Sequence, residues 1–144
     1  MQVRGGHIAR VVVMLGFGAV ATTAAARTFE ERDIKGTWVL TAEGAMLGTQ
    51  MPLALLGVIE FEQGGHCSMN GTINAGGLSW SAIAASCGFQ LQSNGSGSLI
   101  VKLPPGPVVM SAIPLSFVVI DEHEIRTMAT DSVSLSGVLR KQDH

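Results

Sequence analysis

The feature that most constrains this fold is a series of short segments in which apolar and polar residues alternate, separated by glycine-rich turns. Alternation with a period of two predicts β-strands, and no segment carries a convincing helical period. The chain's 18 glycines suit turns and bends better than helices. The predicted strands cover residues 37–42, 55–62, 67–74, 78–91, 98–103, 113–120, 125–130 and 133–140.

Eight strands that follow one another through short turns favour an all-β, antiparallel up-and-down barrel over residues 36–142. Closing the sheet removes the exposed edges that an open sheet has to protect. A two-sheet sandwich is the alternative, because one-sided alternation is compatible with both architectures.

The segment 78–91 changes phase along its length. Trp80 is apolar at an even position, whereas Cys87 and Phe89 are apolar at odd positions. This change predicts a β-bulge near residues 84–85, which would bend the strand. Cys67 and Cys87 lie almost symmetrically about the Gly76-Gly77 turn, so they can face each other across a hairpin and form a disulfide.

Residues 1–26 have the pattern of a secretory signal peptide that is cleaved near Ala26. Arg4 and Arg10 are followed by an apolar run over 11–21 and then by small residues. The run is shorter than the roughly 20 residues that span a bilayer, so we expect no stable membrane anchor. A secreted or periplasmic location agrees with a disulfide. Residues 27–35 would form a lead-in to the barrel.

Charge and motif content exclude several functions. Removal of the leader leaves seven basic and eleven acidic residues, a formal charge of −4, and no basic stripe for nucleic acid. The cluster Asp121-Glu122-His123-Glu124 lies in one turn, where adjacent side chains diverge, so we predict no metal site. Glu60 and Glu62 take the phase opposite to Ile59 and should face solvent. We therefore assign no catalytic residue and no cofactor.

Two apolar connections, 45–53 and 104–110, should meet at one end of such a barrel. Successive connections alternate between the two ends, and the polar turns at 63–65, 93–97 and 121–124 all fall on the other end. The apolar end would carry Met46, Met51 and Met110, whose flexible side chains suit an entrance for an apolar guest. The alternative is that these connections fold inward and plug the barrel.

The sequence Gly36-Thr37-Trp38 at the first strand and Arg140 at the end of the last resemble the signature of lipocalins and related calycins. The resemblance implies that Arg140 packs over Trp38 at a closed end, and that an N-terminal segment covers that end. A second group of motifs resembles small secreted bacterial barrels that are similar to allene oxide cyclase. These motifs are Gly57–Gly65, Asn70-Gly71-Thr72, Gly76-Gly77, Cys87-Gly88-Phe89 and 94–98.

Three functions are compatible with these patterns. The first is binding of a small apolar molecule inside the barrel. The second is a cyclase-like enzyme in the same cavity, which needs an inward polar group that the sequence does not identify. The third is a protein-binding role such as protease inhibition, carried by a flexible segment 27–32. The predicted ligand contacts are Trp80, Phe89, Phe117, Met46, Met51 and Met110.

Overall fold

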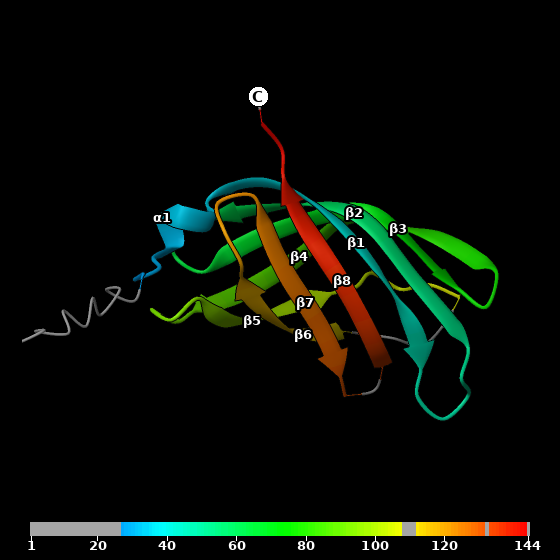
Figure 1. Cartoon of the computed structure of the whole chain (residues 1–144). Helices are drawn as coiled ribbons and strands as arrows, with labels where there is room; N and C mark the ends of the chain where they lie inside the picture. Colours follow the sequence, from blue (N-terminus) through cyan, green and yellow to red (C-terminus); the bar gives the residue numbers. More distant parts are fainter. Residues whose placement is uncertain (1–26, 108–111, 132, 144) are drawn as a thin grey trace, which may run out of the picture.

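A computed structural model describes residues 27–107, 112–131 and 133–143. These residues form an all-β, eight-stranded antiparallel barrel in which every strand pairs with its sequence neighbours and the first strand pairs with the last (Figure 1). The elements are α1 (Glu31–Ile34), β1 (Gly36–Met46), β2 (Pro52–Glu62), β3 (His66–Ala75), β4 (Leu78–Leu91), β5 (Ser96–Lys102), β6 (Ala112–Val119), β7 (Glu124–Thr130) and β8 (Val133–Lys141). The predicted up-and-down barrel is confirmed, and the sandwich is excluded.

The order of the strands divides their connections between two ends. The capped end carries the turns 63–65, 92–95 and 120–123, together with α1. The apolar end carries the turns 47–51 and 76–77 and the connections that follow β5 and β7. In Figure 1, α1 lies at the left, and the β1–β2 and β3–β4 turns lie at the right. This is the arrangement that alternation of the connections predicts.

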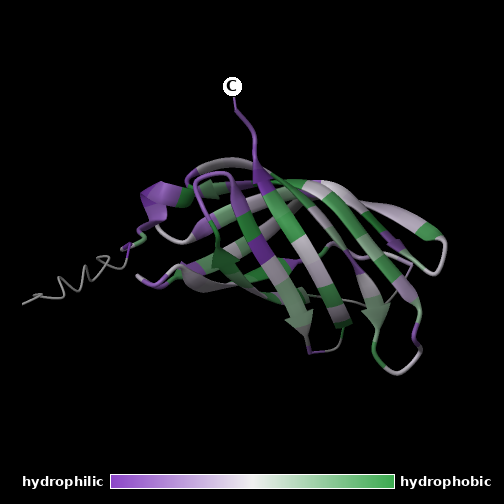
Figure 2. Cartoon of the chain, in the orientation of Figure 1, coloured by the Kyte–Doolittle hydropathy of each residue, from purple (hydrophilic) through white to green (hydrophobic). Residues whose placement is uncertain are grey.

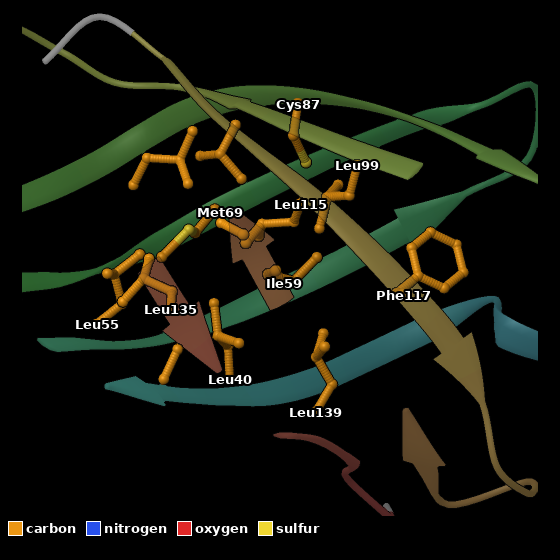
Figure 3. Close-up of a cluster of buried hydrophobic side chains, with 14 of the residues drawn as sticks. Leu40, Leu55, Ile59, Met69, Cys87, Leu99, Leu115, Phe117, Leu135 and Leu139 are labelled. Atoms are coloured by element: carbon orange, nitrogen blue, oxygen red, sulfur yellow. The ribbon is translucent and has the colours of Figure 1, made fainter. Parts of the chain in front are cut away.

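The alternating pattern places one side of every strand inside the barrel. In β2 the burial alternates without a break, with Leu53, Leu55 and Ile59 inside. Glu60 and Glu62 are exposed, as predicted. Figure 2 shows the same alternation as bands of contrasting hydropathy along the strands. The inward side chains form a continuous core, and those in Figure 3 converge from facing strands.

A bulge in β4 changes the phase of that strand as expected. The pair Met69–Ala85 is followed by the pair Gly71–Ala82, so two residues of β4 lie opposite Asn70. The bulge lets Trp80, opposite Ile73, and Phe89 both face inward despite their different parity. Cys67 and Cys87 are paired in the β3–β4 ladder and form a disulfide, with their Cα atoms 4.9 Å apart. The predicted disulfide is confirmed.

The predicted bounds of one connection were wrong. The connection predicted over 45–53 is a short turn, because β1 continues to Met46 and β2 begins at Pro52, and the Met46 N–H donates to the Met51 carbonyl. Within the lead-in, Glu31–Ile34 form one helical turn. This turn is only four residues long, and its helical period is too short to be read from the sequence.

The N-terminal segment is packed against the capped end. The Phe29 N–H donates to the Ser93 carbonyl, and a carboxylate oxygen of Glu31 accepts from the Gly64 N–H at 2.8 Å. Ile34 is fully buried. The segment therefore closes this end, as the calycin resemblance implies. The signal peptide predicted over 1–26 lies outside the described residues, and no helix among the described residues is long and apolar enough to cross a membrane.

Candidate functional site

The residues proposed as ligand contacts divide between the two ends of the barrel. Trp80, Met46 and Met51 lie at the apolar end, whereas Phe89 and Phe117 lie towards the capped end. Met110 lies outside the described residues. The structure therefore brings together only part of the predicted set.

Phe89 and Phe117 both pack in the half of the barrel near the capped end, Phe89 against another aromatic ring and Phe117 against a glycine. The Phe89 ring meets Phe61 edge-on at a centroid distance of 5.1 Å, and Phe61 meets Trp38 edge-on at 6.4 Å. The Phe117 ring lies against Gly97, where any Cβ atom would collide with it. Both phenylalanines are buried. They contribute to the core of a closed end rather than to an accessible surface.

Trp38 anchors the N-terminal cap. Its indole N–H donates to the Ile34 carbonyl at 2.8 Å, and the side chain is completely buried. Gly36 has a φ of +125°, a backbone conformation that other residues rarely adopt. The helical turn, Gly36 and Trp38 thus form one structural unit at the start of β1.

The cation over Trp38 is Lys141, so the assignment of Arg140 to this place was wrong. The Lys141 Nζ lies 5.7 Å from the centre of the Trp38 ring, and the two residues are paired in the β1–β8 ladder. Arg140 is paired with Val39 on the outer face, where its guanidinium lies 3.5 Å from Glu124. Leu139 is buried, so alternation places Arg140 outside and Lys141 inside.

Four apolar side chains at the apolar end form what we call the mouth cluster: Met46, Met51, Trp80 and Leu103. All four continue the inward phase of their strands, pack against the core and are only partly buried. Met51 lies over the Gly76 backbone, close enough that a Cβ there would be 2.9 Å from its Cγ. Leu78, on the same phase, is 56% exposed. At the apolar end, the mouth cluster and Leu78 are thus inward-phase side chains that solvent reaches, and Leu91, near the capped end, is also only partly buried.

Trp80 lies on β4, and its side chain packs against the connection that follows β5. A Cβ atom on Gly106 would lie 2.5 Å from the Trp80 Nε1 and 2.8 Å from its Cε2, so the indole rests directly on the Gly106 backbone. The Nε1 atom is buried and has no hydrogen-bond partner. β4 pairs with β5 only over Cys87–Leu91, so Trp80 lies on the part of β4 that precedes this ladder.

The described interior offers little for acid–base chemistry. Thr127 is the one polar residue among the buried side chains described, and its hydroxyl donates to the Ser116 carbonyl at 2.9 Å. Within residues 27–107, 112–131 and 133–143, no three histidine, cysteine or carboxylate side chains gather to hold a metal ion. Lys141 takes the inward phase at the capped end but is only partly buried, and no carboxylate or histidine is among the described buried residues.

The outer surface of the barrel carries a groove whose lining differs from the mouth cluster. A groove of about 620 Å³ runs over the outer face of β4 and β5, where small and polar residues are joined by the exposed Ile100 and one cation, Lys102. The residues that define it are Gly65, Ser86, Cys87, Gly88, Phe89, Gln90, Ser98, Ile100 and Lys102. It lacks the ring of partly buried apolar side chains found at the mouth cluster.

The fold is that of a closed barrel that could hold a ligand, and its disulfide indicates an oxidising, extracytoplasmic location. No protein-family model matches the sequence. A search of curated proteins gave no match either.

Proposed function

We propose that this protein is secreted or periplasmic and binds a small apolar molecule at the apolar end of its barrel, against the mouth cluster. The supporting observation is the difference between the ends. One end is covered by α1 and an aromatic core, while the other presents Met46, Met51 and Trp80 partly exposed on the inward face. Methionine and tryptophan adapt to apolar ligands of irregular shape.

The binding site is the mouth, not the deep interior. Side chains such as Leu40, Ile59 and Met69 are fully buried within the core cluster and fill the described interior (Figure 3). A ligand would therefore replace solvent over the mouth cluster, and its affinity would come from the apolar area that it covers, roughly 25 cal/mol per Å² before the costs of association.

Two alternatives have weaker support. A cyclase-like enzyme would need an inward acid or base, and the described core supplies only the already bonded Thr127. A protease inhibitor acting through 27–32 would need a free segment. Phe29 and Glu31 instead hydrogen-bond to the turns at the capped end.

The test begins with native mass spectrometry of protein purified from its own host, where we expect a retained small molecule. Purified protein should also bind the apolar dye 1-anilinonaphthalene-8-sulfonate at the mouth. Met51→Gln should weaken dye binding severalfold. The matched control is Met128→Gln, on the outer face of β7, where the side chain is 54% exposed. A protein that arrives empty and binds no dye, or equal effects of the two substitutions, would refute the proposal.

A further inference from the structure

The two tryptophans differ in how their indole N–H groups are satisfied. The Trp38 N–H donates to the Ile34 carbonyl, whereas the buried Trp80 N–H has no partner. Buried polar groups in folded proteins nearly always have a hydrogen-bond partner, and each exception calls for an explanation. A donor without an acceptor at the edge of an apolar surface is a natural point of attachment for a ligand.

The position of Trp80 supports this explanation. Its ring faces inward opposite Ile73 and belongs to the mouth cluster. One side of the indole is occupied by the Gly106 backbone, which approaches the Nε1 atom but provides no hydrogen bond to it. The Gly106 backbone covers the Nε1 atom, so a ligand oxygen can reach the donor only when this contact opens.

We propose that Trp80 donates its indole N–H to a carbonyl oxygen of the ligand, which we infer to be a neutral apolar molecule such as a ketone or ester. This inference rests on the proposed function. A neutral acceptor is favoured because a carboxylate would require a cation when it leaves water. The described residues of the mouth cluster are all apolar, and Lys102, near the end of β5, takes the outward phase and is exposed.

The experiment compares three probes with the same chain length: 2-nonanone, nonane and nonanoate. Their affinities are measured by dye displacement, and the two indole N–H signals are followed in ¹H–¹⁵N spectra. We expect 2-nonanone to move the Trp80 signal downfield and nonane to leave its hydrogen-bonding state unchanged. The Trp38 signal, fixed by Ile34, is the internal control. Nonanoate should bind more weakly than the ketone.

Trp80→Phe isolates the hydrogen bond, because it keeps an aromatic ring and removes the donor. We expect it to weaken 2-nonanone binding about tenfold and nonane binding less than twofold. Equal losses for both probes, or a stationary Trp80 signal with bound ketone, would overturn the carbonyl assignment while the apolar site stands. Failure of every probe and of the dye to bind would overturn both proposals. Tighter binding of nonanoate would show that the ligand class is anionic.

Discussion

The same residue type has two different roles at the two ends of this barrel. Trp38 is completely buried, hydrogen-bonded to Ile34 and covered by Lys141. Trp80 is partly exposed, rests on Gly106 and has an unpaired N–H. The comparison teaches that the capped end satisfies the indole N–H of its tryptophan within the fold, while the apolar end leaves that of Trp80 without a protein acceptor.

Removal of the disulfide should have the largest effect on stability. The Cys67–Cys87 bond joins residues 20 positions apart, and the double substitution Cys67→Ala/Cys87→Ala should lower the free energy of unfolding by about 3 kcal/mol. Because Cys67 is paired with Phe61 next to the turn 63–65 at the capped end, we expect dye affinity at the other end to change less than twofold under conditions where the variant is folded. Urea denaturation followed by circular dichroism measures the first quantity. Loss of dye binding by fully folded protein would argue against separate roles for the two ends.

Trp38→Phe and Trp80→Phe compare the two ends directly. The first substitution removes the donor to a buried carbonyl and should cost about 2 kcal/mol. The second removes an unpaired donor, so the free energy of unfolding should fall by less than about 0.5 kcal/mol, or should rise. Circular dichroism should follow unfolding, because each substitution alters fluorescence. Equal destabilisation by both would contradict the distinction.

Gly106→Ala tests the contact between the Gly106 backbone and the Trp80 indole. A Cβ would collide with the indole, so either the ring or the connection must move, at a cost of about 1 kcal/mol and with a severalfold change in dye affinity. Gly88→Ala is the control, since a Cβ there meets its nearest neighbour at an ordinary 3.8 Å. Thermal unfolding and dye titration measure the two effects. Identical behaviour of the two variants would rule out the proposed contact.

Lys141→Ala and Arg140→Ala are the pair of variants for which we expect the smallest difference in the free energy of unfolding. Lys141 covers Trp38, and loss of the cation–π contact should cost about 0.5–1 kcal/mol. Arg140 is an exposed partner of Glu124, so its removal should cost less than about 0.5 kcal/mol. Denaturant midpoints distinguish the two. A larger effect of Arg140→Ala would restore the calycin-like role that the resemblance implied for this residue.

Several features of the candidate site could be predicted from sequence, and the reasons for the others are physical. The strand order alone assigned Met46 and Met51 to one end of the barrel. The same alternation also places Arg140 outside and Lys141 inside, but the resemblance to calycins favoured the wrong residue. The positions of Phe89 and Phe117 near the capped end follow from strand direction, although their inward phase alone made them seem equivalent to Trp80.

The sequence by itself determined the barrel, its bulge, its disulfide and the separation of polar from apolar connections, because each depends on local alternation and on the parity of the strands. The tertiary structure alone decided that Gly106 lies against Trp80 and that Ile34 accepts from Trp38. It also decided which hydrogen bonds hold the lead-in over the capped end, a position that the calycin resemblance had implied. These contacts depend on how loops fold over a closed sheet, and no periodic pattern records the distance between atoms of separate segments.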